Sequence, residues 1–244
     1  MSGLGTIDLG RWLFRWRSYT PIPILIVLLA VILESRPTVF VEGDGTQLWV
    51  GLGVALALAG EALRFFTLGQ VPEGTSGQGS SLEASALNTR GPYAYVRNPL
   101  YLGNLGICLG LLLVANRSWA YLIGIGFFVV QYFFIVRAEE SFLREKYGRQ
   151  FDRYASLVPR WIPRLTPAYP GRLREGFDLG RALKKEHNPF AAWTSGLLLL
   201  LGWNFYGAGS LTGGRLAVLI SIEAVVLACF VIVKAYKRGW LKAL

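Results

Sequence analysis

Six apolar runs, separated by shorter polar or charged segments, dominate this chain. They cover residues 20–33, 47–68, 100–115, 118–136, 191–206 and 214–236. A helix needs about 20 apolar residues to cross the ~30 Å hydrocarbon core of a bilayer, and several runs approach that length. The first and third are shorter, so we expect them to be tilted, extended at their ends or partly re-entrant. The pattern predicts an all-α, polytopic helical membrane protein with about six transmembrane helices.

Composition agrees with a membrane location. Of 244 residues, 53% are hydrophobic and 16% are charged, which is more apolar material than one soluble core of this size can bury. The net charge of +10 is concentrated in particular loops, and this argues against nucleic-acid binding. Cys108 and Cys229 fall inside predicted helices and His187 is the single histidine, so the sequence predicts neither a disulfide nor a metal site.

The basic residues predict the orientation. Of the 25 lysines and arginines, 21 lie in the N-terminal arm, in residues 69–99 and 137–189, and at the C-terminal end. Six crossings would put these four stretches on one side, opposite loops that are acidic or neutral. By the positive-inside rule, we expect both termini to be cytoplasmic. The first run has no small-residue cleavage site after it, so we expect it to remain as a signal anchor.

A polar segment at residues 89–104 precedes the third run and reads TRGPYAYVRNPLYLGN. Pro92 and Pro99 push the residues before them away from helical geometry. Pro99 suits the first turn of a helix whose N-cap is Asn98. The positive end of that helix and the charge of Arg97 would favour an anionic group. Taken alone, the segment is also typical of an interfacial turn with belt tyrosines.

A second polar segment, at residues 137–163, follows the fourth run and reads RAEESFLREKYGRQFDRYASLVPRWIP. One continuous helix would place Glu140, Tyr147 and Tyr154 on a single stripe. Carboxylates at the end of an apolar span are costly unless they meet a cation. For Glu139 and Glu140, the simplest partners by spacing are Arg137, Arg144 and Lys146.

Together the two segments resemble the isoprenylcysteine carboxyl methyltransferase family and its phospholipid N-methyltransferase relatives. The resemblance rests on Gly-Pro-Tyr-x-x-x-Arg-Asn-Pro-x-Tyr-x-Gly, about thirty apolar residues, and then Glu-Glu-x-x-Leu-x-x-x-Tyr-Gly with a Val-Pro-Arg-x-Ile-Pro ending. It covers roughly residues 89–164 and does not account for the chain beyond about residue 170.

The resemblance implies a helical membrane enzyme in which the second segment folds against the first as a cytoplasmic cap and encloses S-adenosylmethionine. Asn98 stands where many relatives have histidine, and an amide does not titrate near neutrality, so general-base chemistry is not expected there. The cofactor-binding residues implied by position are Tyr93, Arg97, Asn98, Pro99, Tyr101, Gly103, Glu139, Glu140, Tyr147, Tyr154 and Pro159.

Methyl transfer from a sulfonium needs mainly alignment of the reacting atoms, which contributes ~7 to 11 kcal/mol in favourable cases. We expect Glu140 to pair with the amino group of the cofactor, and Arg97 to take its carboxylate. An acceptor carboxylate or phosphate would be oriented by Arg137 or Arg160. The catalytic candidates are therefore Arg97, Arg137 and Glu140.

The second apolar run carries two charges inside the membrane. Glu61 and Arg64 fall at i and i+3, so they share a helix face. Intramembrane charges commonly mark functional sites, and with Arg160 these two residues are the substrate candidates. A mutual ion pair without a functional role explains them equally well.

The sequence thus predicts S-adenosylmethionine-dependent methyl transfer to a lipophilic acceptor, an isoprenylcysteine carboxylate or a related lipid, at the cytoplasmic membrane face. The expected partners are the bilayer and a lipophilic or prenylated substrate. One alternative is an NADPH-dependent sterol-type reductase, whose related fold carries a similar Arg-His-Pro-x-Tyr segment. Another is a non-enzymatic lipid-binding or transport protein.

Three parts are expected along the chain. An interfacial arm spans residues 1–19, and a methyltransferase-like core with its cytoplasmic cap spans residues 20–170. A C-terminal extension, residues 171–244, would add two transmembrane helices after a turn at residues 186–189. Small residues offer close-approach positions for docking this extension, at Ala191, Ala192, Ser195 and Gly196.

Overall fold

The computed structural model describes residues 2–19, 21–33, 46–72, 84–168 and 176–240, and these residues contain helices and no strands. The all-α prediction is confirmed, and each predicted apolar run corresponds to one helix. The α-helices are α1 (Ser2–Arg15), α2 (Pro21–Leu33), α3 (Thr46–Gln70), α4 (Pro99–Ala115), α5 (Ser118–Tyr147), α6 (Arg149–Leu157), α7 (Leu179–Gly207) and α8 (Gly213–Lys237), and two short 3₁₀ helices are η1 (Arg17–Tyr19) and η2 (Gly91–Ala94).

Long apolar helices place the chain in a membrane. Among the described residues, three helices are long and apolar enough to cross it, namely Gln47–Gln70, Ser118–Tyr147 and Gly213–Lys237. The apolar parts of α2 and α4 are shorter, as their sequences indicated. Six crossings and cytoplasmic termini remain predictions.

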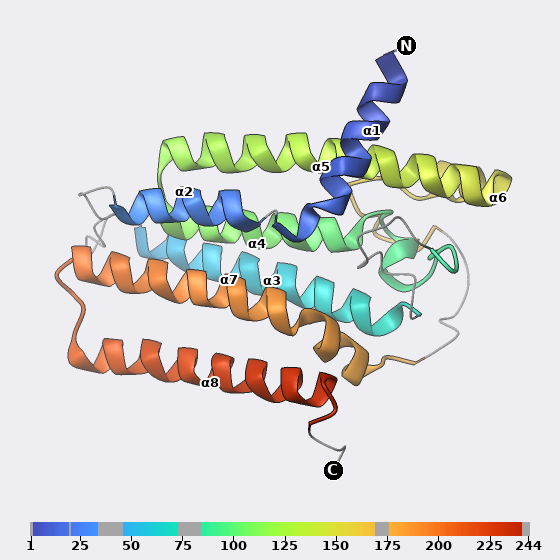
Figure 1. The fold of residues 1–244 in the computed structure, drawn as a ribbon. Coiled ribbons are helices and arrows are strands. Elements are labelled where there is room, and N and C mark those ends of the chain that lie inside the picture. The colour runs from blue at the N-terminus through green and yellow to red at the C-terminus, as the bar shows by residue number, and fades with distance from the viewer. Residues whose placement is uncertain (1, 20, 34–45, 73–83, 169–175, 241–244) are drawn as a thin grey trace.

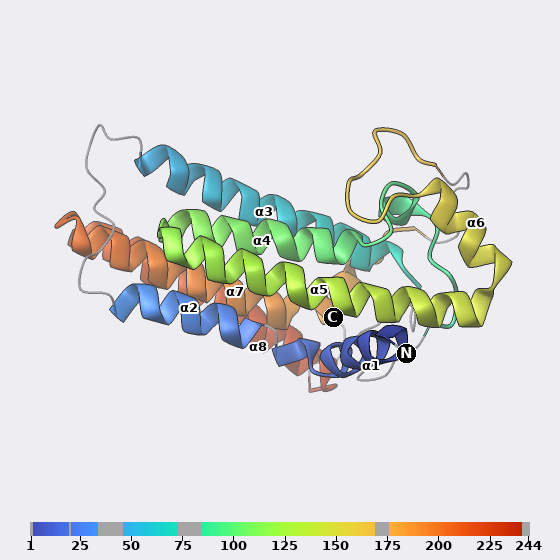
Figure 2. The same ribbon diagram turned by 90° about the horizontal axis from the view of Figure 1, so that it is seen from above.

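The helices of the apolar runs lie lengthwise beside one another and alternate in direction, in the order α2, α3, α4, α5, α7 and α8 (Figures 1 and 2). At one end of this bundle lie α6 and the segment that contains η2, which together form a cap (Figure 2). The C-terminal end of α8 points toward this end, and α1 lies there across α5 (Figure 1). The bundle therefore has a cap end, where the two sequence motifs meet, and an opposite end formed by the turns between helices.

Glycines allow α3 and α4 to approach closely. A Cβ atom added at Gly60 would lie 2.5 Å from the carbonyl oxygen of Gly103, and one added at Gly110 would lie 2.5 Å from that of Gly53. Membrane helices gain stability from such backbone approach, because lipid supplies little hydrophobic drive between them. Gly103, which was predicted to bind the cofactor, is thus buried at a helix contact beside Gly60 and Arg64.

Two predictions about local structure are wrong. Residues 137–154 do not form one helix, because the chain turns at Gly148, whose φ of 49° suits glycine. Residues 186–189 do not form a turn, because α7 runs through them with Pro189 inside the helix. Glu186 and His187 are both buried there, so tertiary packing outweighs the lost backbone hydrogen bond of the proline.

Candidate active site

The two motifs form the cap by bonding to each other. The backbone N–H of Arg97 donates to the carbonyl of Pro159 at 2.9 Å, and Ala168 donates to Ala94 at 2.9 Å. The Tyr154 hydroxyl donates to the carbonyl oxygen of Tyr93 at 2.8 Å. The expectation that the second segment folds against the first is confirmed.

Asn98 and Pro99 set the start of α4 as predicted, with Pro99 in the first turn and Asn98 as the N-cap residue. The Asn98 side chain does not cap the helix. Its Nδ2 instead donates to the carbonyl oxygen of Arg160 at 3.1 Å. Asn98 therefore links the two segments, and the first N–H groups of α4 receive no side-chain oxygen from it.

Glu140 is held by two arginines. Arg97 Nη1 lies 2.9 Å from Glu140 Oε1, and Arg160 binds both carboxylate oxygens, at 2.9 and 2.5 Å. Burial lowers the pKa of Arg97, with Glu140 opposing that effect, and the hydrogen bond to Glu140 raises the pKa of Arg160. The cluster carries a net positive charge, which favours an anion nearby.

The pairing of Glu140 with Arg137, Arg144 or Lys146 is therefore wrong. Arg144 pairs with Asp152 at 2.8 Å on the exposed surface. Arg137 is exposed, with its guanidinium 5.4 Å from the centre of the Phe133 ring. The bend at Gly148 explains the difference, since it returns Arg160 to Glu140 from beyond α6.

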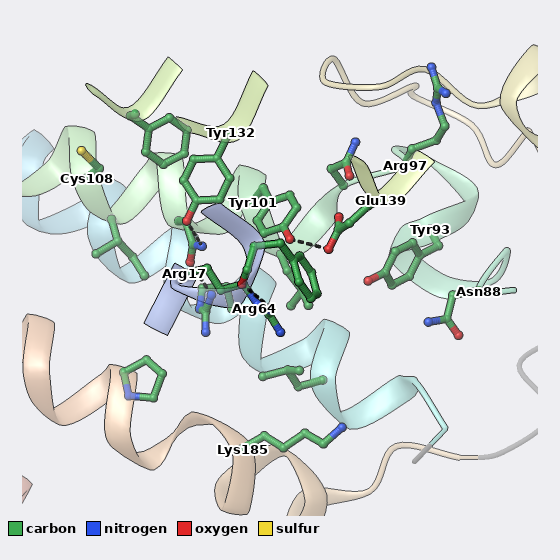
Figure 3. Close-up of a pocket in the computed structure, with 18 of the residues that line it drawn as sticks. Arg17, Arg64, Asn88, Tyr93, Arg97, Tyr101, Cys108, Tyr132, Glu139 and Lys185 are labelled. Atoms are coloured by element: carbon green, nitrogen blue, oxygen red, sulfur yellow. Dashed lines mark hydrogen bonds between the residues drawn. The ribbon is translucent and has the colours of Figure 1, made fainter. Parts of the chain in front are cut away.

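Glu139 faces a different neighbourhood from Glu140. It accepts a hydrogen bond from the Tyr101 hydroxyl at 2.6 Å (Figure 3). The Tyr101 ring packs against Tyr132, with ring centres 4.7 Å apart. Glu139 is thus a cavity carboxylate held in place by a phenol.

A cavity of about 810 Å³ joins the cap to the interior of the bundle. In Figure 3, Tyr93 and Asn88 lie at one end of the close-up and Cys108 lies at the other. Four helices supply apolar side chains to the lining. These are Phe14 of α1, Ile24 and Leu25 of α2, Ile107 and Leu111 of α4, and Phe128 of α5. The cavity therefore offers a polar end under the cap and an apolar end among the helices.

A second polar network crosses from α3 to α7. Arg64 binds Glu186 through Nε at 2.6 Å and Nη2 at 2.9 Å, and its Nη1 donates to Asn104. The Glu61 carboxylate accepts from Trp193 Nε1 at 2.9 Å. Glu61 and Arg64 still attract each other, but α7 supplies a hydrogen-bond partner for each, so they are not a simple isolated pair.

The structure brings most of the predicted site residues together. The cavity is lined by Arg64, Tyr93, Arg97, Asn98, Tyr101, Glu139, Glu140 and Tyr154. Others bond to or adjoin lining residues without lining it themselves: Pro159 bonds to Arg97, Arg160 to Glu140 and Glu61 to Trp193, and Pro99 follows Asn98. Three predicted residues do not line the cavity: Gly103 packs at the α3 contact beside Arg64, Arg137 lies on the surface, and the Tyr147 hydroxyl donates to the carbonyl oxygen of the lining residue Ala84 at 2.7 Å.

Sequence reasoning missed several lining residues. The charged ones are Arg17, Lys184, Lys185 and Lys237, from both ends of the chain. These residues lie outside the two motifs, so apart from their charge nothing in the sequence indicated that they line the cavity. An acid partner for Arg64 could have been anticipated, since a buried arginine needs a counter-charge, but spacing pointed to Glu61.

Residues 48–150 match the family model described as phospholipid methyltransferase. Residues 48–150 form a phospholipid methyltransferase family domain. This methyltransferase domain runs from α3 into α6, so the resemblance carried by the two motifs is confirmed. The end of the second motif, with Tyr154, Pro159 and Arg160, lies outside the match, as do α7 and α8. No curated protein and no solved structure matches the chain.

Proposed function

We propose that the protein transfers a methyl group from S-adenosylmethionine to a lipophilic acceptor, an isoprenylcysteine carboxylate or a related lipid, at the cytoplasmic membrane face. The observation that carries this proposal is the single cavity shared by the motif residues and an apolar space between helices. A polar cofactor and the head of a greasy acceptor can meet there. The basic cap supports a cytoplasmic orientation.

The residues at the polar end fit this cofactor. Glu139 is the better partner for an amino group, because Glu140 is already held by two arginines. Arg97 would take the carboxylate, and aromatic side chains at Tyr93, Phe151 and Tyr154 suit a purine or a sulfonium. S-adenosylmethionine supplies an activated methyl group, so the protein has mainly to bind and align the reactants.

With Glu139 assigned to the amino group of the cofactor and Glu140 held by two arginines, the described lining favours an acceptor that is nucleophilic without help from a base. Asn98 does not titrate, and burial raises the pKa of Tyr93 and of Tyr154 above the usual value, so both phenols stay protonated at neutral pH. The single histidine, His187, does not line the cavity. A carboxylate is already ionised at this pH, whereas an ammonium group must first lose a proton. This contrast supports a carboxylate acceptor.

Ligand binding and methyl transfer together test the proposal. S-adenosylmethionine and S-adenosylhomocysteine should raise the melting temperature of detergent-purified protein, and NADPH should not. Labelled methyl should then pass to a prenylated cysteine carboxylate in mixed micelles. Stabilisation by NADPH alone would favour a reductase. Absence of binding to all three ligands would favour a lipid-binding protein without this chemistry.

A further inference from the structure

The ion pair between Arg64 and Glu186 joins the methyltransferase domain to the extension. Arg64 lies on α3 inside the family match, and Glu186 lies on α7 outside it. The side chains are 10% and 2% exposed, and two hydrogen bonds connect them. A pair held through two parallel bonds fixes the plane of the guanidinium as well as its position.

Arg64 lines the cavity, and Glu186 lies behind it. Three of the five guanidinium N–H groups are used by Glu186 and Asn104. Asn104 is itself fixed, because its Nδ2 donates to the Tyr132 hydroxyl at 2.8 Å. Arg64 therefore keeps two donors for a ligand while its orientation is set from both sides.

Arg64 has two acidic neighbours, Glu186 and Glu61, whereas further cations line the cavity that it faces. Arg17, Lys184 and Lys185 line the same cavity, and Figure 3 shows the labelled Arg17 and Arg64 between the Tyr93 end and Cys108. Lys184 Nζ lies 4.6 Å from the ring centre of Tyr236, so an aromatic ring also holds this cation at the wall. A cavity wall with several cations beside the two remaining donors of Arg64 favours an oxyanion.

We propose that Glu186 is a positioning residue of the acceptor site: it holds Arg64 so that the guanidinium binds the oxyanion of a lipophilic acceptor. This inference rests on the proposed function, and it names the chemistry of the acceptor head as a carboxylate or a phosphate. It also gives the extension a function: α7 would form one wall of the acceptor site, and the domain of residues 48–150 would form the other.

Equilibrium binding without turnover tests this role. The probes are palmitate, hexadecyl phosphate and the neutral methyl palmitate, each added to detergent-purified full-length protein. The wild type should bind one of the charged probes at least about tenfold more tightly than the ester, as expected for a charge-assisted hydrogen bond. Stronger palmitate binding would identify a carboxylate head, and stronger hexadecyl phosphate binding would identify a phosphate head.

Two variants separate positioning from structural support. Glu186→Gln removes the charge that orients Arg64, and Arg64→Met with Glu186→Leu removes both members of the ion pair, while Glu61 keeps its hydrogen bond from Trp193. In both, the preference for the charged probe should fall to within about twofold, while affinity for S-adenosylmethionine stays unchanged. If Glu186→Gln does not fold, the double variant decides, since exchange of a whole ion pair for apolar residues is well tolerated.

Glu223→Gln is the matched control. Glu223 is a carboxylate of the same extension, accepts from Ser195 Oγ at 2.8 Å, and does not line the cavity, so its variant should keep the preference. Survival of the preference in the double variant, or a wild type that does not distinguish charged from neutral probes, would overturn the inference alone. Failure of the proposed function would show separately, as absence of S-adenosylmethionine binding.

Discussion

At the scale of single residues, the structure redistributes the roles of the two adjacent glutamates. Glu140 lies among arginines and ties the two segments of the cap together, whereas Glu139 faces the cavity with its carboxylate fixed by Tyr101. Neighbouring positions on a helix point in directions about 100° apart, so adjacent acids readily serve different tasks. One of them supports the site and the other is available to a ligand.

Arg97→Ala and Glu139→Gln should each weaken S-adenosylmethionine binding. Each change removes a charge-assisted hydrogen bond to the cofactor, which is worth ~1.5 to 3 kcal/mol. Isothermal titration calorimetry on purified protein measures the loss. Arg144→Ala is the control, because Arg144 pairs with Asp152 on the exposed surface and should leave affinity unchanged. Unaltered affinity in both site variants, with the fold intact, would remove these assignments.

The motif residues were predictable from the sequence, but their partners were not. Tyr93, Arg97, Tyr101 and Glu139 all line the cavity as expected. The pairing of Glu140 with Arg160 depends on the bend at Gly148, and several basic residues nearby in the sequence competed for the same carboxylate. Motif and spacing identify which residues reach the cavity more readily than they identify the bonding partner of each residue.

At the scale of helices, apolar length predicted most of the elements. The run at residues 47–68 became α3 (Thr46–Gln70), and that at 118–136 became the apolar part of α5 (Ser118–Tyr147). The errors lie where polar or amphipathic sequence borders an apolar run. Periodicity continues across Gly148 although the helix does not, and polar residues before Pro189 are helical although their composition suggested a turn.

Small residues proved important at a helix pair other than the one expected. Gly196 on α7 has only Leu25 Cδ2 nearby, 3.9 Å from where a Cβ would lie, so it is not a close-approach position. The extension docks instead through side-chain bonds, including Asn204 Nδ2 to the Val114 carbonyl at 2.9 Å. Close backbone approach occurs instead between α3 and α4, at Gly60 and Gly110.

Gly110→Ala should therefore destabilise the protein, and Gly51→Ala should not. The new methyl at Gly110 would lie 2.5 Å from the Gly53 carbonyl oxygen, and overpacking of this kind costs ~1 to 3 kcal/mol. Gly51 lies on α3 with nothing within 4 Å, so alanine there should be neutral or slightly stabilising. Thermal unfolding in detergent compares the two. Equal melting temperatures would show that the α3–α4 contact tolerates a side chain.

At the scale of the whole molecule, the arrangement of helix ends makes the orientation testable. The cap, the start of α7 and the end of α8 lie toward one end of the bundle, and the α7–α8 turn lies at the other (Figure 1). Reporter tags at residues 1 and 244 should both indicate the cytoplasm, whereas a tag at Gly209 should indicate the opposite side. A C-terminal tag on the far side would contradict six crossings.

The sequence could not predict which residues of the extension contact the rest of the protein. Arg64 had an acid three residues away, and Glu186 lies 122 residues from it. Both positions satisfy the need of a buried arginine for a counter-charge, so sequence alone favours the local partner. The extension also borders the cavity, through Lys184, Lys185 and Trp193 of α7.

Truncation after Pro170 tests what the extension contributes. The cap would keep its own bonds, such as Arg97 to Pro159, so S-adenosylmethionine binding should remain nearly intact. Without α7, Glu61 and Arg64 lose Trp193 and Glu186, but their i, i+3 spacing lets them neutralise each other. The cavity would lose the wall formed by Lys184, Lys185 and Trp193. Methyl transfer to lipid acceptors should therefore fall much more than cofactor affinity, as measured with labelled cofactor in mixed micelles. A truncated protein that folds and methylates every acceptor at the full-length rate would show that α7 and α8 do not form the acceptor site.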